Sequence, residues 1–180
     1  LDEETHTHSF VLGKTGSGKS VFLHTLLHQA MLKYSPQSLQ FYLMDFKIGG
    51  VELNRYRNYP HVRALMADQG DLKVMLEILR DLEKLMTERG RALREAGCTK
   101  LKDYNARHSD SPMPRLVLLV DECQELFKEG RSGMQDEIDH IVTKIAKQGR
   151  NQGVHIIFAT QTPCGCVMPR DLPSQITDPY

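Results

Sequence analysis

Residues 11–27 have the sequence VLGKTGSGKSVFLHTLL, whose first half is a glycine-rich turn between two apolar segments. Residues 13–20 match the pattern G-x-x-x-x-G-K-[ST] at every fixed position. The short apolar segment 9–12 before the turn predicts a strand. Residues 18–33 after it predict a helix, with Val21, Phe22, Leu26, Leu27, Ala30 and Met31 on one face. Strand, glycine turn and helix in this order are the context in which the pattern holds phosphate groups.

The chemistry of this turn follows from its residue types. Glycines let successive backbone N–H groups point inward around phosphates, and the start of the helix adds a favourable dipole. Lys19 is expected to reach the β- and γ-phosphates of ATP, and the Ser20 hydroxyl to bind Mg²⁺. The alternative, a glycine turn without a ligand, fits the surrounding strand and helix poorly.

Two acidic residues follow a buried strand further along the chain. The apolar run 116–120 predicts a strand buried on both faces, so Asp121 and Glu122 lie at its carboxyl end, where open α/β sheets bind ligands. Asp121 is expected to join Ser20 in the Mg²⁺ shell, and Glu122 to activate the water that attacks the γ-phosphate. The alternative for Glu122 is capping of the following turn. The expected nucleotide-binding residues are Gly13, Lys14, Thr15, Gly16, Ser17, Gly18, Lys19, Ser20, Val21 and Asp121.

Thr160 and Gln161 end the last predicted strand, residues 154–160, at the same edge of the sheet. A neutral amide at this edge can hydrogen-bond the γ-phosphate or the attacking water. We therefore predict that Gln161 senses whether ATP is present.

The rest of the chain alternates between strands and helices. Further strands are expected at residues 39–46 and 61–67, a loop at 54–60, and helices at 71–96 and about 134–147. The 71–96 helix has one apolar stripe, and its charged side chains, among them Arg80, Glu83, Arg89 and Arg94, are expected to face solvent. This order predicts a single α/β domain over residues 1–180, with a mostly parallel sheet flanked by helices.

Composition excludes several classes of protein. Lys and Arg number 23, as do Asp and Glu, so the net charge is zero and no overall basic surface indicates nucleic-acid binding. No apolar run is long enough to span a membrane, and residues 1–10 lack the layout of a signal peptide, which favours a cytosolic setting. Cys98, Cys123, Cys164 and Cys166 are expected to be reduced thiols, because Cys164 and Cys166 lack a second ligand pair at zinc-binding spacing.

Four segments, GKTGSGKS, LMDFKIGG, LVLLVDE and GRNQGVHIIFATQTP, occur in the order found in the FtsK/SpoIIIE group of the FtsK–HerA ATPases. The segment MTERGRALREAGCTKLKDYNAR also resembles that family, and the resemblance spans residues 9–163. It implies a RecA-like P-loop fold, assembly into hexameric rings, and ATP hydrolysis that moves double-stranded DNA. Relatives in type VII secretion move proteins.

The resemblance also implies roles for single residues. Lys19 and Ser20 match the phosphate and magnesium positions, Asp121 and Glu122 the acid pair, and Gln161 the sensor. Asp45 and Lys47 fall in the family's Asp-x-Lys element. Arg150 matches an arginine that is a candidate to contact ATP across a subunit boundary, although an arginine at a helix end is equally expected there.

Three functions are compatible with these features. The first is a cytoplasmic motor that moves double-stranded DNA, favoured by the Tyr104-Asn105 segment. The second is a secretion motor that moves protein substrates, favoured by the DFK-x-GG and GVHIIFATQ segments. The third is a module that senses ATP without hydrolysing it. In each case we expect this chain to be a core fragment of a longer protein, with membrane attachment left open.

Overall fold

The computed structural model describes residues 7–47, 49–50, 52–67, 72–127 and 133–161. Five strands form one sheet, in the order β1-β5-β4-β2-β3, and every neighbouring pair is parallel. The parallel sheet predicted from the sequence is therefore confirmed. The strands are β1 (Ser9–Leu12), β2 (Leu39–Asp45), β3 (Val62–Met66), β4 (Arg115–Asp121) and β5 (Val154–Thr160).

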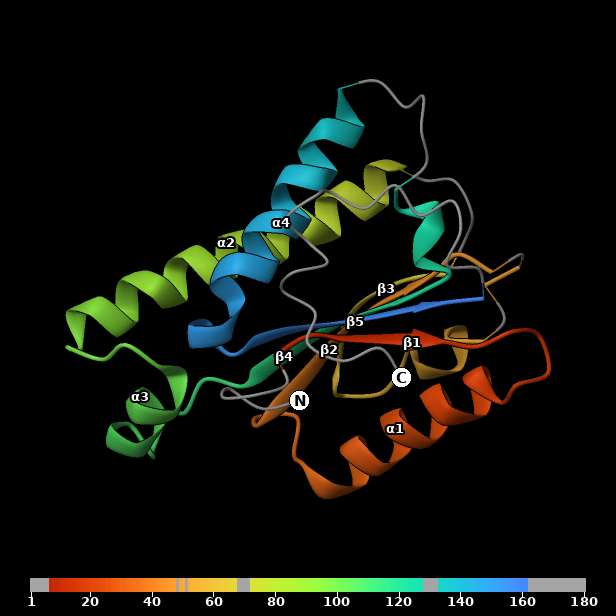
Figure 1. Cartoon of the computed structure of the whole chain (residues 1–180). Coiled ribbons are helices and arrows are strands. Elements are labelled where there is room, and N and C mark those ends of the chain that lie inside the picture. Colours follow the sequence, from red (N-terminus) through yellow and green to blue (C-terminus); the bar gives the residue numbers. More distant parts are fainter. Residues whose placement is uncertain (1–6, 48, 51, 68–71, 128–132, 162–180) are drawn as a thin grey trace.

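Helices cover both faces of this sheet. Helices α2 and α4 pack on one face and α1 lies on the other, while α3 lies beyond the edge at which β4 and β5 begin (Figure 1). Two 3-10 turns follow β2 and β4. The helical elements are α1 (Lys19–Lys33), η1 (Asn54–Tyr56), α2 (Leu72–Glu95), α3 (Leu101–Arg107), η2 (Cys123–Glu125) and α4 (Met134–Gln152).

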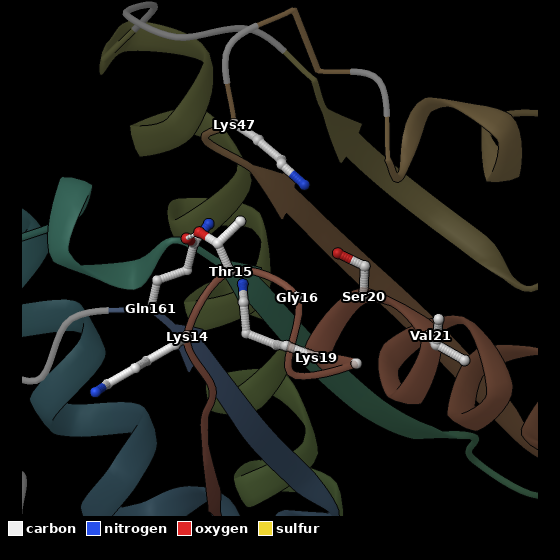
Figure 2. Close-up of a pocket in the computed structure, with 9 residues that line it drawn as sticks. Lys14, Thr15, Gly16, Lys19, Ser20, Val21, Lys47 and Gln161 are labelled. Carbon is white, nitrogen blue, oxygen red and sulfur yellow. Dashed lines mark hydrogen bonds between the residues drawn. The ribbon is translucent and has the colours of Figure 1, made fainter.

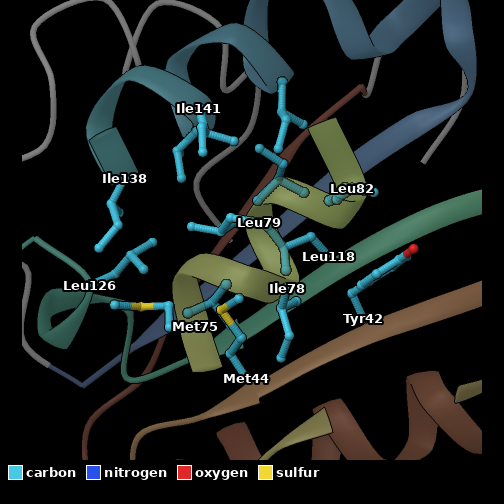
Figure 3. Close-up of a cluster of buried hydrophobic side chains, with 14 of the residues drawn as sticks. Tyr42, Met44, Met75, Ile78, Leu79, Leu82, Leu118, Leu126, Ile138 and Ile141 are labelled. Carbon is cyan, nitrogen blue, oxygen red and sulfur yellow. The ribbon is translucent and has the colours of Figure 1, made fainter. Parts of the chain in front are cut away.

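The sheet separates two hydrophobic cores. In β4, Leu116, Leu118 and Val120 face the larger core with α2 and α4, whereas Val117 and Leu119 face the core with α1. Figure 3 shows the larger core, where side chains from α2 and α4 meet those of the sheet. Because β4 buries both faces, its alternating side chains fix the sheet between the helices and hold the end of β4 in place.

The predicted buried face of α1 is partly wrong. Leu27 is buried as expected, and so is Leu23, which was not on that face. Val21 is 69% exposed and Phe22 48% exposed. Helix α1 carries apolar residues on several sides, so their spacing does not single out the side that meets the sheet.

The assignment of Arg89 to a solvated face of α2 is also wrong. Arg89 is buried and donates hydrogen bonds to the carbonyls of Gln152 (3.0 Å) and Pro114 (2.6 Å). It therefore ties α2 to the end of α4 and to the start of β4, and burial lowers the pKa of its guanidinium to about 10. Helix α4 extends five residues beyond the predicted end at Lys147, to Gln152.

No helix in the described ranges is long and apolar enough to cross a membrane. Cys98 and Cys123 are both buried. Cys164 and Cys166 lie outside the described residues.

Candidate nucleotide-binding site

The glycine-rich turn forms a loop between β1 and α1. Gly13 N–H donates to the Thr160 carbonyl (3.2 Å) and Ser17 N–H to the Lys14 carbonyl (3.0 Å), so the loop is tied to the end of β5 and closed on itself. Gly16 (φ 80°) and Gly18 (φ 91°) adopt the left-handed conformation, which favours glycine. Backbone N–H groups at the start of α1 thus face the same region as the loop.

This loop borders a hollow of about 330 Å³. Figure 2 shows how the side chains around it lie. The residues that line it are Lys14, Thr15, Gly16, Gly18, Lys19, Ser20, Val21, Lys47 and Gln161. Most of the predicted nucleotide-binding residues therefore lie on one surface, with Gly13 and Ser17 in the same loop.

Lys19, the first residue of α1, is buried and pairs with both carboxylates at the end of β4. Its ammonium contacts Asp121, and its Nζ lies 3.1 Å from Oε1 of Glu122. Burial raises the pKa of Asp121 above its ordinary value, against the opposing hydrogen bond from Lys19. The structure thus brings together the predicted phosphate-binding lysine and the acid pair, with one ammonium shared between two carboxyl groups.

Glu122 has an unusual backbone and a crowded carboxylate. Its φ of 56° and ψ of 51° are left-handed, and it is the one non-glycine residue with positive φ in the described part of the chain. The carboxylate accepts hydrogen bonds from Gln161 Nε2 (2.6 Å) and Gln124 Nε2 (2.9 Å), as well as from Lys19. Burial acts to raise the pKa of Glu122, but these hydrogen bonds hold it below its ordinary value. Its side chain makes no capping bond to η2, which disfavours the capping alternative.

Gln161 connects the acid pair to the glycine loop. Its Oε1 accepts a hydrogen bond from the Thr15 hydroxyl (2.5 Å), while its Nε2 donates to Glu122. Thr160 donates to Oε1 of Gln124 (2.5 Å), which adds a second link between β5 and the η2 turn. The Gln161 side chain therefore links Thr15 of the glycine loop to the Glu122 carboxylate.

A magnesium ion would need oxygen ligands beside the phosphates. Ser20 is half-buried on the wall of the hollow, and the Asp121 carboxylate lies at the adjoining strand end, so the available donors are a hydroxyl and a carboxylate. These donors suit a hard cation that keeps several waters. Within the described residues there is no group of three or more His, Cys, Asp or Glu side chains that could hold a metal ion.

Arg150 does not reach this hollow within the chain. It is exposed near the end of α4, just before β5 begins, whereas Gln161 follows the end of β5. The seven residues of β5 separate the two by roughly 20 Å. Arg150 is therefore placed for a helix-end role or for contact with a neighbouring subunit.

Lys47 is the residue of this surface to which the sequence alone gave no defined role. The sequence pattern that could have identified Lys47 is a lysine two positions after Asp45, an acidic residue at the end of a buried strand. In the structure this lysine lies on the wall of the hollow, opposite the glycine loop (Figure 2).

A sequence profile of the FtsK/SpoIIIE family matches residues 1–164. The ESX-5 secretion system protein EccC5 of Mycobacterium tuberculosis is 34% identical over 166 residues, which cover 86% of this chain and 11% of that protein. The DNA translocase FtsK of Leptospira interrogans is 32% identical over 170 residues, which cover 91% of this chain and 17% of that protein. The chain thus spans a small part of the length of these relatives.

Solved structures agree with this match. The cytoplasmic domain of the type VII secretion ATPase EccC from Thermomonospora curvata superposes with a TM-score of 0.75 and 29% identity, over 94% of this chain and 20% of that chain. The pCW3 conjugation coupling protein TcpA, solved with ATPγS, superposes with a TM-score of 0.80 and 24% identity, over 98% of this chain and 48% of that chain, and shows a shared fold. This chain belongs to the FtsK/SpoIIIE family and is a P-loop ATPase domain of that family.

Proposed function

We propose that this chain is the motor core of a translocase and hydrolyses ATP in the hollow beside the glycine loop. The observation that carries the proposal is the meeting of β4 and β5 at this loop. Glu122 and Gln161 come from the ends of two neighbouring strands, and Gln161 bonds both to Glu122 and to Thr15 of the loop. In this proposal Glu122 is the general base and Gln161 is the amide that senses the phosphate.

In this proposal Lys19 exchanges partners when nucleotide binds. Its ammonium is paired with Asp121 and Glu122 in the structure, and a phosphate oxygen would compete for the same donor. Ser20 and Asp121 would hold Mg²⁺, which when bound supplies positive charge beside the phosphates and the acid pair. Transfer of Lys19 to phosphate leaves Glu122 with its two amide donors, Gln124 and Gln161, and thus oriented to accept a proton from water.

Double-stranded DNA is the first candidate cargo, because relatives of this chain include DNA translocases named FtsK. Because the net charge is zero, there is no overall electrostatic attraction to DNA, and DNA would have to bind to local contacts inside a ring of subunits. The Tyr104-Asn105 segment adds little to this assignment. Asn105 uses both ends of its amide to hold the Met113 backbone, at 2.9 Å each.

A secreted protein is the second candidate cargo, favoured by the 34% identity to EccC5. With either cargo we expect the motor to work as a ring of subunits. We also expect it to lie on the cytoplasmic side, because the similar EccC domain is a cytoplasmic domain.

The test is ATP turnover by the assembled protein and by its Glu122→Gln variant. Loss of the general base is expected to lower kcat by about 10²- to 10⁴-fold, with nucleotide affinity retained. Glu95→Gln is the matched control, because Glu95 is an exposed residue at the far end of α2. Unchanged turnover in Glu122→Gln would contradict the catalytic assignment and favour a module that senses ATP without hydrolysing it.

The same assay separates the two cargoes. Stimulation of turnover by duplex DNA selects the DNA motor, whereas stimulation by a secreted protein substrate, with a flat response to DNA, selects the secretion motor.

A further inference from the structure

A third lysine borders the hollow from outside the glycine loop. Lys14 lies in the loop and Lys19 begins α1, but Lys47 lies in the segment after β2. Figure 2 shows its side chain pointing from that segment towards the side of the hollow where Ser20 lies. The hollow is thus bordered by cations on two sides.

The segment that carries Lys47 is held firmly in place. The buried Asp45 carboxylate accepts hydrogen bonds from the backbone N–H groups of Lys47 (3.0 Å), Glu52 (3.1 Å) and Leu53 (3.0 Å). Gly50 adopts a φ of 55°, and a Cβ added there would lie 1.7 Å from the Ala67 carbonyl oxygen. One carboxylate and one close backbone contact therefore fix the position from which Lys47 extends.

The ammonium of Lys47 is also oriented. Its Nζ donates to Oε1 of Glu52 (2.6 Å), while Oε2 of Glu52 lies 3.0 Å from Nε2 of His24 on α1. The hydrogen bonds from Lys47 and His24 lower the pKa of Glu52 to about 2, so its carboxylate is ionised near neutral pH. His24 lies one turn after Ser20, and its Nδ1 is 2.9 Å from the Tyr56 hydroxyl. A chain of polar contacts thus runs from α1 to Lys47.

Lys47 has fewer carboxylate partners than Lys19 and can donate further hydrogen bonds. Lys19 faces two carboxylates at the end of β4, whereas Lys47 is hydrogen-bonded to one, and an ammonium has three donors. The hydrogen bond that Lys47 donates to Glu52 is the main reason that the pKa of Lys47 is raised, and the charges of Asp121 and Glu122 add to the increase. Lys47 is therefore a cation that Glu52 holds in position, and it interacts electrostatically with Asp121 and Glu122.

We propose that Lys47 contacts the terminal phosphate of bound ATP from the side opposite the glycine loop, and that Glu52 is the positioning residue that aims it. The inference rests on the proposed ATP site and adds to it a residue from the segment after β2. It makes the segment after β2, together with His24 and Tyr56, responsive to whether the terminal phosphate is present.

The test compares the affinities of the chain for Mg²⁺–ATPγS and for ADP. Lys47→Ala is expected to weaken ATPγS binding by roughly 10- to 100-fold, the range for one hydrogen bond to a charged group, and to leave ADP binding unchanged. Glu52→Gln should shift the same ratio in the same direction by a smaller factor, because it retains a hydrogen-bond acceptor but loses the charge. Lys47→Arg, which keeps the charge, should restore part of the ATPγS preference.

Lys102→Ala on α3 is the matched control, since Lys102 is exposed and belongs to an element far from the hollow. Thermal unfolding of each variant checks that it is folded. Equal affinities of wild type and Lys47→Ala for ATPγS would overturn the assignment, and so would equal losses for ATPγS and ADP in a folded variant. Wild-type chain that binds neither nucleotide would instead overturn the proposed function itself, and this inference with it.

Discussion

Glu122 shows how a single residue combines strain with hydrogen bonding at the site. Its left-handed backbone conformation costs roughly 1–2 kcal/mol for a residue with a Cβ. Three side chains hold its carboxylate, and two of them, Lys19 and Gln161, also border the hollow. Strained residues persist where the surroundings determine them, and they are common where a side chain must be aimed. The strain therefore supports a functional role for Glu122 over a role in the turn alone.

His8, which is remote from the hollow, is a buried histidine whose pKa affects the stability of the fold. Its Nε2–H donates to the Ala146 carbonyl (3.0 Å) and its Nδ1 accepts from Ile156 N–H (3.0 Å), an arrangement that requires the neutral ring. Burial is the main reason that the pKa of His8 falls from 6.5 to about 4, and the nearby His155 adds to the decrease. Between these pH values the unfolded chain binds more protons than the folded chain, so stability decreases as the pH is lowered.

We therefore predict that the free energy of unfolding falls between pH 7.5 and pH 5, with His8 contributing roughly 2 kcal/mol of the loss. Urea unfolding of wild type and His8→Gln at both pH values measures this contribution. The variant should be less stable at pH 7.5 and should have a smaller pH dependence. His108→Gln, at an exposed position, should keep the wild-type dependence. An equal pH dependence in wild type and His8→Gln would contradict the role of His8.

At the scale of elements, the turn from α4 into β5 sets the position of the strand that carries Gln161. Gly153 ends α4 with a φ of 67°, and a Cβ there would lie 2.2 Å from Cδ2 of Leu101 in α3. Gly149, one turn earlier, has the Val154 carbonyl oxygen 2.6 Å from the position of a Cβ. Two glycines thus let α4, β5 and α3 approach one another closely.

We predict that Gly153→Ala lowers the free energy of unfolding by roughly 2–4 kcal/mol, from the left-handed backbone and the contact with Leu101 together. Gly97→Ala is the matched control, because Gly97 has a φ of 63° with nothing within 4 Å of its Cβ position, and it should cost only about 1 kcal/mol. Denaturant unfolding measures both changes.

A double-mutant cycle separates the two parts of the Gly153→Ala cost. In a Leu101→Ala background the contact is removed, so Gly153→Ala should cost about as much as Gly97→Ala. A full cost in that background would show that the close contact contributes nothing.

The elements differ in how far sequence could predict them. The glycine loop, the strand before it and the acid pair at the end of β4 depend on residues that are close in the chain, so the sequence pattern was sufficient to predict them. The burial of Arg89 depends on carbonyls of Pro114 and Gln152, which are distant in sequence, and the charge-rich helix surface gave no sign of it. Helix α3 (Leu101–Arg107) is too short to show a clear period, so it was not predicted. The position of Lys47 on the hollow likewise required the tertiary structure.

At the scale of the whole molecule, the sheet places the proposed catalytic groups at one edge and Arg150 at the other. The carboxyl ends of β4 and β5 carry Asp121, Glu122 and Gln161, while Arg150 precedes the start of β5. A residue at the opposite edge can contribute to this site only from a neighbouring copy. Heterologous contacts that repeat around a ring would bring opposite edges of successive subunits together.

We predict that Arg150→Ala subunits and Glu122→Gln subunits of the assembled protein are each inactive alone and recover turnover when mixed. An arginine supplied by a neighbour contributes roughly 10³- to 10⁵-fold to the rate, so its loss is expected to abolish measurable turnover. In a randomly mixed ring with equal amounts of both, about a quarter of the sites combine an intact Glu122 with an intact Arg150 from the next subunit.

ATP turnover of the mixture, compared with each variant alone, measures this recovery. If Arg150 served only the end of its own helix, Arg150→Ala would lower stability without abolishing turnover. If it acted within its own subunit, mixing would restore nothing, because every subunit would lack one of the two groups. Recovery to about a quarter of wild-type turnover therefore requires that each site be completed by the neighbouring subunit.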